Sequence, residues 1–393
     1  MSALGREGRR GDTAPMSSFT IARIETFVLR APVAEPVVTS FFAIPERVSV
    51  LVRVEDTEGA HGWGDVWCNF PSYGAEYRGL VLHRSVAPLA IGRDVDDPAA
   101  LWRELAMRSH VMAVQSGDAG AFAAALAGLD AALWDLKARR AGLPLARLLG
   151  GAVRDVPVYA SGLNPGDGPD VAERARAEGH RRFKQKIGFG EEVDLPNLRR
   201  IASGLRGGEA LLVDVNQGWT VDEARRMAPV LNELPLDWVE EPIVADRPEH
   251  EWRLLAETYA APLAGGENLR GQDLLRAASE PWLGVIQPDV GKWGGVSGCF
   301  AAGLAAVEAG KRYCPHWLSG GVGLMASAHL LSAVGGEGML EVDSNPNPLR
   351  TVLAQPFPQL AEGAFKLTDA PGIGVEPDVE AARPFLVTKH EAA

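Results

Sequence analysis

From about residue 155 the sequence alternates short apolar runs with helical stretches, and this alternation strongly limits what the chain can fold into. Eight of the runs have the length and composition of buried strands: VPVYAS, RFKQKI, ALLVDV, LDWVEE, APLAGGE, WLGVIQPD, KRYCPH and GMLEVD. Strands that alternate with helices form a parallel sheet. Eight such units predict an α/β barrel of the (β/α)₈ type.

Ionisable residues stand at or near the ends of seven of these runs. They follow one another at intervals of 22 to 28 residues: Lys186, Asp214, Glu240, Glu267, Asp289, His316 and Glu341. A single acidic residue at a strand end is most often a helix cap or a solvated loop residue. Because the active sites of such barrels lie at the C-terminal ends of the strands, seven in register indicate one shared site.

The run RFKQKIGFG contains two lysines, Lys184 and Lys186, one residue apart. Alternate side chains of a strand point to the same face, so both lysines share a face. Two like charges inside a barrel repel each other and lose hydration. Lys184 is expected to depress the pKa of Lys186, which would make Lys186 a base near neutral pH.

Asp214, Glu240 and Glu267 form an acidic trio on adjacent strands. Three neighbouring carboxylates require a cation, and all-oxygen ligation suits Mg²⁺ rather than Zn²⁺. Glu241 follows Glu240 directly, and strand alternation predicts that only one of the two points inward.

His316 and Asp289 are predicted to lie across the barrel from the lysines. An aspartate beside a histidine holds one ring nitrogen by a hydrogen bond and raises the basicity of the ring. The alternative for His316 alone is a core histidine that is hydrogen-bonded for packing. The other histidines lie away from these strand ends and receive no role.

The rest of the chain divides around the barrel. Residues 1–18 are polar and Gly-rich and are expected to form a disordered extension, and residues 19–150 read as an α+β domain of strands followed by helices. Between the first two strands, AEPVVTSFFAIPE (34–46) is expected to be a loop with Phe41 and Phe42 at its tip. The barrel is assigned to 151–362, and 363–393 are expected to pack back on the first domain.

Composition excludes several classes of protein. The net charge of −12 argues against a nucleic-acid partner. Three cysteines far apart in the sequence do not form a disulfide framework, and a reducing cytoplasm fits them. No apolar run appears long enough to span a membrane, which takes roughly 20 residues, and no signal-peptide core precedes the first strand.

Several of these motifs, in this order, resemble the enolase superfamily and its mandelate racemase subgroup. The similar segments are LAGLDAALWDLKARRAGLPLARLLGG (126–151), KQK, DVNQGW, VEEP, GGEN, QPDVGKWGG, CPHW and LEVD. The resemblance extends over nearly the whole chain from about residue 20. It implies a modified (β/α)₇β TIM-type barrel with an N-terminal α+β capping domain, and a homo-oligomer of dimer to octamer.

The resemblance also implies roles for the strand-end residues. Asp214, Glu240 and Glu267 would bind Mg²⁺, while Lys186 and the His316–Asp289 dyad would be the two acid/base groups on opposite faces of the substrate. Glu341, if protonated, would be an electrophile, and Lys184 would support Lys186 and the developing charge. Asp289 stands where relatives with two catalytic lysines carry the second one; the nearby Lys292 is expected to point elsewhere.

The shared step would be removal of the proton α to a carboxylate, giving a metal-stabilised enediolate. Dehydration of an acid sugar, an aldonate or aldarate, to a 2-keto-3-deoxy acid is the leading interpretation. Racemisation or epimerisation of a 2-hydroxy acid or amino-acid derivative, and ring opening of a sugar lactone by a cycloisomerase, remain alternatives. KIGFGEEVDL and NPNPLR resemble, more loosely, acid-sugar enzymes of the cycloisomerase kind.

Specificity for the small carboxylate substrate is expected from loops over the barrel mouth. The expected contacts are Asn216 near the metal and the aromatic residues Phe41, Phe42, Trp67 and Trp317. These aromatic side chains are unusually apolar for a polyol site, and they would serve equally well to pack the lid on the barrel.

Two other classes of barrel fit the sequence less well. A catalytically silent barrel is expected to have lost one of the strand-end groups, and all seven are present. A phosphate-binding aldolase-type barrel would need a Gly-rich phosphate loop after the last strands. SGGVG (319–323) reads as a tight turn instead.

Overall fold

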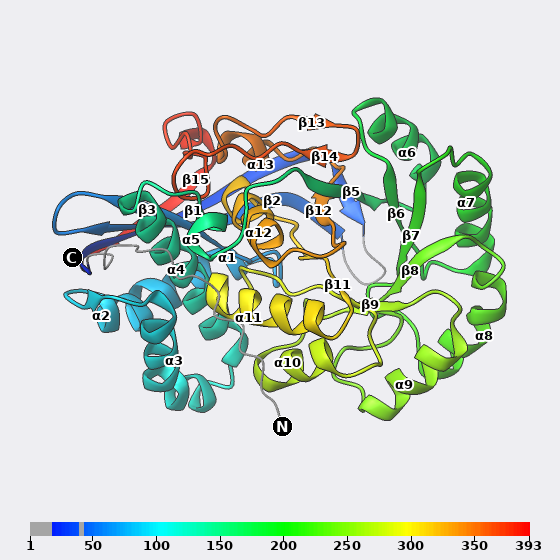
Figure 1. Cartoon of the computed structure of the whole chain (residues 1–393), viewed down its shortest axis with the longest axis horizontal. Helices are drawn as coiled ribbons and strands as arrows, with labels where there is room; N and C mark the ends of the chain where they lie inside the picture. Colours follow the sequence, from blue (N-terminus) through cyan, green and yellow to red (C-terminus); the bar gives the residue numbers. More distant parts are fainter. Residues whose placement is uncertain (1–17, 39–42) are drawn as a thin grey trace, which may run out of the picture.

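The computed structural model describes residues 18–38 and 43–393, which form a capping domain and a barrel (Figure 1). The predicted extension lies outside the described residues except for Ser18, as do Phe41 and Phe42. The predicted fold class, an α/β barrel with an N-terminal α+β cap, is confirmed.

An antiparallel sheet forms the frame of the cap, in the order β15-β1-β2-β3. Its strands are β1 (Phe19–Val38), β2 (Ala43–Asp56), β3 (His61–Val66) and β15 (Leu386–Ala392). The short β4 (Asp94–Val95) pairs with the start of β1. The loop predicted for 34–46 is wrong in its described parts, because both strands continue into it and Val37 pairs with Ile44 after a register shift. A bulge thus carries the strands further than the Pro-containing sequence suggested.

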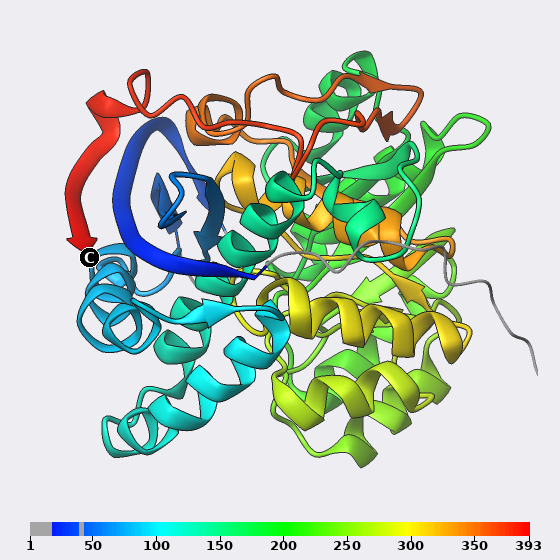
Figure 2. The same cartoon turned by 60° about the vertical axis from the view of Figure 1, so that its left-hand side comes forward.

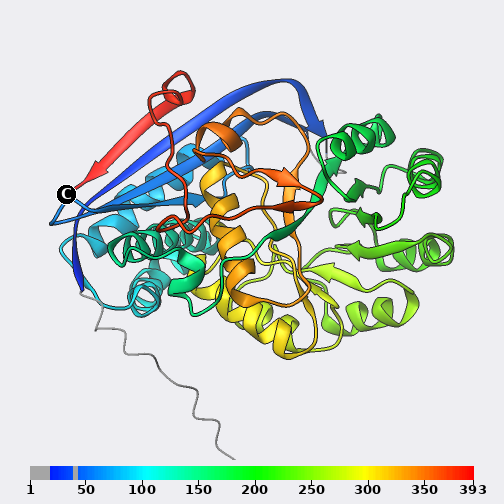
Figure 3. The ribbon, with the colours of Figure 1, turned by 45° about the horizontal axis from the view of Figure 1, so that its top comes forward.

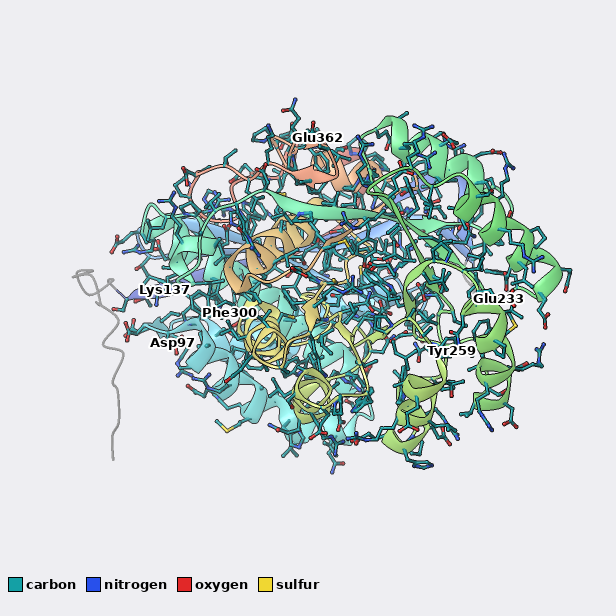
Figure 4. The ribbon with its side chains drawn as sticks, turned by 45° about the vertical axis from the view of Figure 1, so that its right-hand side comes forward. Asp97, Lys137, Glu233, Tyr259, Phe300 and Glu362 are labelled. Carbon is teal, nitrogen blue, oxygen red and sulfur yellow. The ribbon has the colours of Figure 1, made fainter. Side chains whose placement is uncertain are left out.

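The cap also contains α-helices. They are α1 (Gly74–Val81), α2 (Ala87–Ala90), α3 (Pro98–Gln115), α4 (Ala119–Arg140) and α5 (Leu145–Leu148). Of these, α1 and α4 pack against this sheet. Gly62 and Gly64 let α4 approach β3 closely, since a Cβ on Gly64 would lie 2.0 Å from the Gly128 carbonyl oxygen. Asp97 Oδ1 accepts from the Ala99 N–H at 3.0 Å and caps the start of α3, and Lys137 Nζ of α4 donates to the Asp96 carbonyl at 2.5 Å. Figure 4 labels Asp97 and Lys137.

One described helix is long and apolar enough to cross a membrane, contrary to the expectation from the sequence. It is α4, and 78% of its most apolar window is buried inside the protein. Its Ala- and Leu-rich faces pack against the cap sheet on one side and against α11 of the barrel on the other. A core helix buried on both sides accounts for its composition.

The barrel is built from parallel strands. They are β5 (Val156–Leu163), β6 (Arg182–Lys186), β7 (Ala210–Asp214), β8 (Leu236–Glu240), β9 (Leu263–Gly265), β10 (Val285–Ile286), β11 (Arg312–Tyr313) and β12 (Leu340–Asp343). Their hydrogen-bonded order runs from β11 to β5, and β12 pairs with β5. All eight predicted strands are present, so the periodicity located them correctly.

Helices alternate with the barrel strands and form an outer ring (Figure 1). They are α6 (Gly168–Ala177), α7 (Glu191–Ser203), α8 (Val221–Leu231), α9 (Glu249–Thr258), α10 (Gly271–Ser279), α11 (Gly295–Glu308), α12 (Gly321–Val334) and α13 (Pro348–Val352). The strands β13 (Leu360–Ala361) and β14 (Ala364–Phe365) form a hairpin. In this hairpin β14 pairs antiparallel with the start of β5.

The interior of the barrel is filled, not open. One buried cluster lies inside the ring of strands: Tyr159, Leu212, Trp238, Ala264, Val285, Cys314 and Met339. These apolar side chains close the lower part of the barrel and leave the polar residues to the strand ends.

Cap and barrel are joined by hydrogen bonds near the strand ends. Asp130 of α4 accepts from the backbone N–H and the hydroxyl of Ser297 at 2.9 and 2.6 Å, at the start of α11. Figure 2 shows α11 beside the cap helices. The Trp67 N–H donates to the Gly291 carbonyl at 3.2 Å. The cap therefore holds the loop between β10 and α11, which carries residues of the site.

Candidate active site

A cavity lies between the cap and the C-terminal ends of the barrel strands. Lys186, Asp214, Glu267 and His316 line it from the barrel. The cap contributes other lining residues: Val37, Ile44, Arg47, Trp67, Asn69 and Phe70. Four of the seven predicted strand-end residues therefore reach this cavity.

Lys184 lies beneath the cavity in a layer of buried ion pairs. Its Nζ is 2.6 Å from Glu240 Oε1 and 2.7 Å from Glu341 Oε1, and its side chain is 1% exposed. Burial lowers the pKa of Lys184, but the two carboxylates outweigh this and hold the pKa well above its usual value. Lys184 is therefore a permanent cation within the barrel.

Lys186 is one layer nearer the cavity and has a different environment. Among the residues that the structure describes, no carboxylate forms an ion pair with its Nζ. Burial lowers the pKa of Lys186, and the nearby Lys184 lowers it further, whereas Asp214 and Asp343 oppose the change without reversing it. The direction agrees with the expected base, but burial rather than Lys184 is the main cause.

His316 is held between acidic groups on the opposite side of the cavity. Its Nδ1 is 2.5 Å from Asp289 Oδ2 and its Nε2 is 2.5 Å from Glu267 Oε2. Burial lowers the pKa of His316, but Glu267, Glu341 and Asp289 together raise it well above its usual value. In this structure His316 is thus an imidazolium, a group that can donate a proton.

Glu341 does not meet the condition set for an electrophile. Its Oε1 accepts from the Ser161 hydroxyl at 2.5 Å, and its Oε2 accepts from the Trp317 N–H at 3.1 Å. Burial raises the pKa of Glu341, but Lys184 and His316 lower it to below its ordinary value. The lowered pKa favours the ionised carboxylate, whereas an electrophilic role depends on the protonated form; the role of Glu341 stays a prediction.

Glu240 and Glu241 both point inward, so the expectation that alternation would turn one away is wrong. Glu241 has a φ of 38°, which interrupts the strand, and its carboxylate lines the cavity. Glu240 accepts from Lys184, from Gln287 Nε2 at 2.7 Å and from Trp238 Nε1 at 3.1 Å. Glu240 therefore belongs to the buried layer, and Glu241 to the cavity.

Lys292 also contradicts its prediction, because it lines the cavity. Its Nζ lies 3.1 Å from Glu267 Oε1 and 4.4 Å from the centre of the Trp67 ring. The backbone N–H of Lys292 donates to Asp289 Oδ1 at 3.0 Å, which turns the loop back over the strand ends. The sequence spacing alone does not reveal that turn.

The carboxylates of the site fit a hard divalent cation by their chemistry. Asp214, Glu241 and Glu267 offer only oxygen donors. Burial and the charge of Glu267 raise the pKa of Asp214 and hold that of Glu241 well above normal, which shows that negative charge is crowded here. Among the described residues no three acidic, imidazole or thiol groups converge on one metal position; Glu267 is turned to His316 and Lys292 instead.

Only some of the predicted substrate contacts line the cavity. Asn216 and Trp67 line the cavity. Trp317 does not: its ring is 2% exposed, it packs in the core against Gly323, and its Nε1 donates to the Gly320 carbonyl at 2.7 Å. The residue after His316 faces away because backbone alternation places neighbouring side chains on opposite sides. Phe41 and Phe42 lie outside the described residues.

Several lining residues were not anticipated from the sequence. Amide side chains are numerous among them: Asn69, Gln217, Asn268 and Asn345, in addition to Asn216. Arg47 and Asp343 also line the cavity and form an ion pair between cap and barrel. Asp343 was detectable as the second acid of LEVD, but nothing in the sequence pairs it with Arg47.

Comparison with known proteins decides the family. Residues 23–150 match the mandelate racemase/muconate lactonizing enzyme N-terminal domain, and residues 169–382 match the enolase C-terminal domain-like family. The chain belongs to the mandelate racemase/muconate lactonizing enzyme family of the enolase superfamily. It is therefore an enzyme of the superfamily whose members abstract a proton α to a carboxylate.

Relatives extend along almost the whole chain. D-galactarolactone cycloisomerase of Agrobacterium fabrum is 30% identical, covering 93% of this chain and 98% of its own. Arabinonate dehydratase of Saccharolobus solfataricus is 27% identical, covering 83% and 87%.

Solved structures of the same family are also similar. A mandelate racemase/muconate lactonizing enzyme from Bordetella bronchiseptica RB50 is 48% identical, with a TM-score of 0.88 over 94% of this chain and 99% of that one. A racemase from Streptomyces coelicolor A3(2) with bound magnesium is 27% identical, with a TM-score of 0.84 over 93% and 100%.

Proposed function

We propose that this enzyme dehydrates an acid sugar, an aldonate or aldarate, to a 2-keto-3-deoxy acid. One observation carries the proposal: Lys186, whose pKa burial lowers, and His316, whose Nδ1 lies 2.5 Å from Asp289 Oδ2, line the same cavity. A neutral amine accepts a proton at neutral pH, and an imidazolium donates one. Dehydration needs both groups at once.

In the proposed reaction Lys186 Nζ removes the proton from C2 of the substrate. His316 Nε2 donates its proton to the hydroxyl group on C3, the C–O bond breaks with its electron pair on oxygen, and water leaves. The resulting enol gains a proton at C3 and loses its hydroxyl proton, which gives the 2-keto acid. Both groups then return to their starting protonation states by exchange with solvent.

Asp214 and Glu267 would bind Mg²⁺ together with a third carboxylate from the Glu240–Glu241 pair. Bound there, the ion supplies positive charge to the carboxylate oxygens of the substrate. Their oxygen-only donors and crowded negative charge support this assignment, as does the magnesium in the related racemase. Glu267 must turn from His316 to bind the ion, which leaves His316 facing the substrate with Asp289 behind it.

The lining of the cavity supports a hydroxyl-rich substrate. Five amide side chains and an arginine–aspartate pair surround it, whereas Trp67, Phe70 and a few aliphatic residues supply its apolar part. Amide groups donate and accept hydrogen bonds, as sugar hydroxyls require.

Ring opening of a sugar lactone is the second candidate, because the cycloisomerase relative is similar over nearly its full length. The first step is the same proton removal by Lys186. The leaving group is then the ring oxygen instead of a hydroxyl group, and His316 again supplies the proton. Racemisation would instead require His316 to return a proton to C2.

The test is a screen of acid sugars, their lactones and hydroxy acids with Mg²⁺. The 2-keto acid is measured directly, and exchange of the C2 proton is followed by NMR in D₂O. Keto acid from an open-chain aldonate or aldarate supports dehydration, and turnover of lactones alone supports the second candidate. Exchange without elimination from any compound refutes both and indicates a racemase or epimerase.

The proposed setting is a cytoplasmic homo-oligomer, of dimer to octamer. Cys68, Cys299 and Cys314 are unpaired and buried, which suits a reducing compartment. Size-exclusion chromatography with light scattering tests the assembly.

A further inference from the structure

Arg47 and Asp343 form a buried ion pair that lines the cavity from two domains. Arg47 comes from β2 of the cap and Asp343 from the end of β12, and Arg47 Nη2 lies 2.7 Å from Asp343 Oδ2. Both residues are 4% exposed. Neither residue gives or takes a proton in the reaction proposed above, so the presence of the pair in the cavity requires another explanation.

The two facing atoms are close but poorly hydrogen-bonded. Among the described residues, neither Arg47 Nη2 nor Asp343 Oδ2 has a hydrogen-bond partner of acceptable geometry, although they are within ion-pair distance of each other. Buried polar atoms nearly always have such partners. A pair with these two atoms unsatisfied has capacity for a ligand.

The remaining contacts of the pair hold it in place. Arg47 Nε donates to the Pro346 carbonyl at 3.1 Å. Asp343 Oδ1 accepts from the backbone N–H and the side-chain Nδ2 of Asn345, both at 3.0 Å. Asn345 Nδ2 also donates to the Gly162 carbonyl at 3.0 Å. The unsatisfied donor and acceptor are therefore presented on a fixed support.

The Arg176–Glu209 pair of this chain has a different geometry. Arg176 and Glu209, 5% and 1% exposed at their side chains, are joined by two hydrogen bonds of 2.7 and 2.9 Å. These residues do not line the cavity. Arginine–carboxylate pairs that serve structure favour this two-point geometry, and the Arg47–Asp343 pair lacks it.

We propose that the Arg47–Asp343 pair binds a hydroxyl group on a distal carbon of the substrate. A hydroxyl group donates one hydrogen bond and accepts others, so it satisfies Asp343 Oδ2 and Arg47 Nη2 together. A second carboxylate is a poorer ligand, because Asp343 repels the charge that Arg47 attracts. The inference rests on the proposed function and deepens it: the pair selects polyhydroxy acids over their deoxy analogues.

The expected discrimination is large. A site built to bind a substrate hydroxyl rejects the analogue without it, because the buried polar groups remain unpaired. We expect kcat/KM to fall on the order of 10²-fold or more for one deoxy analogue of an active acid sugar. The analogue that shows this loss of kcat/KM identifies the substrate carbon whose hydroxyl group faces the pair.

The decisive variant replaces both partners, Arg47→Met with Asp343→Leu. Removing both charges avoids leaving one of them buried alone. For the wild-type enzyme, kcat/KM is measured with an active acid sugar and with its 4-, 5- and 6-deoxy analogues. We then measure the ratio of kcat/KM for the hydroxylated substrate to kcat/KM for its deoxy analogue. In the double variant we expect this ratio to fall to within a few-fold of one. Loss of Asp343 can also change the pKa of Lys186. That change affects kcat/KM for both substrates equally and therefore cancels in the ratio.

The matched control is Arg176→Met with Glu209→Leu, which removes a buried pair outside the cavity. This control should keep the wild-type ratio. Wild-type enzyme that does not discriminate at any position overturns the proposal. A double variant with a lower Tm but an unchanged ratio also overturns it, since the pair would then only join cap to barrel.

Failure of the proposed function is a separate outcome. If hydroxy acids exchange the C2 proton without forming a keto acid, dehydration fails, but the same ratio measured on exchange rates still tests the pair. If no hydroxylated carboxylate reacts or exchanges, both proposals are refuted.

Discussion

Lys184 and Lys186 are one residue apart on one strand, yet the barrel gives them opposite properties. Lys184 lies in the buried layer, where two carboxylates within 2.7 Å hold its pKa well above normal. Lys186 lies in the cavity layer, where burial without an ion pair lowers its pKa. The same side chain thus has a raised pKa in one layer and a lowered pKa in the next, because the nearest carboxylates differ.

The largest effect should follow loss of the base in the cavity layer. Lys186→Met should reduce C2 proton exchange on the order of 10³-fold, since acid–base groups contribute about 10² to 10⁴. The free energy of unfolding should stay the same or rise, because a buried amine without a paired carboxylate is removed. NMR exchange in D₂O and urea unfolding measure the two effects.

His316→Asn is the control for this variant, because it removes the group on the opposite side of the cavity. It should stop proton transfer from that side while leaving Lys186 intact. Exchange undiminished in both variants would refute the assignment of two acid/base groups.

Lys184→Met should instead affect stability. Its loss leaves Glu240 and Glu341 buried without their common cation, and breaking a buried pair in this way costs about 3 to 5 kcal/mol. Urea unfolding measures the change. A loss below about 1 kcal/mol would mean that the two layers do not differ as described.

Glu240 and Glu241 extend the comparison, because Glu240 lies in the buried layer and Glu241 lies in the cavity layer. Glu240→Gln and Glu241→Gln should each weaken Mg²⁺ binding measured by calorimetry. The larger loss, at least about 10-fold, identifies the third metal ligand. If Glu241→Gln has the larger effect, the metal lies wholly in the cavity layer; if Glu240→Gln does, Glu240 must exchange contacts with Lys184 when the metal binds.

The smallest effect is the dependence of stability on pH. The pKa of Lys186 is lower in the folded than in the unfolded protein, so folding releases a proton and stability rises with pH up to the unfolded value near 10.4. The slope is at most about 1.4 kcal/mol per pH unit. The stability advantage of Lys186→Met over the wild type should therefore shrink as the pH rises through that window.

Lys184 behaves in the opposite way. Its folded pKa is raised, so its contribution is fully present below about pH 10.4 and is lost only as the pH rises above that value. Urea titrations of both variants at several pH values test the signs. Parallel pH dependences for the two lysines would contradict the comparison.

The sequence predicted the barrel well because its pattern is local. Eight apolar runs separated by helices suffice to place the strands, and the residues that end them come together by the symmetry of the barrel. His316, Asp289 and Glu267 were found in this way and lie within hydrogen-bonding distance. Their roles in catalysis stay predictions.

The errors arose where the backbone departs from regular strands. Glu241 points inward because its φ is positive, and Lys292 returns to the cavity because its loop turns on Asp289. Strand alternation cannot predict either. Arg47 and Asp343 were missed for another reason: their contact joins residues 296 positions apart in two domains, and no local pattern encodes it.

The last strand of the chain has a consequence for how this enzyme is made. Figure 3 shows β15 lying along β1, with pairs from Ile24–Ala392 to Leu29–Leu386. Because β15 follows the barrel in the sequence, β1 can pair with β15 only after the barrel strands have been synthesised. Until β15 is made, this edge of β1 is open, so the cap that supplies one wall of the cavity is completed only after the barrel strands.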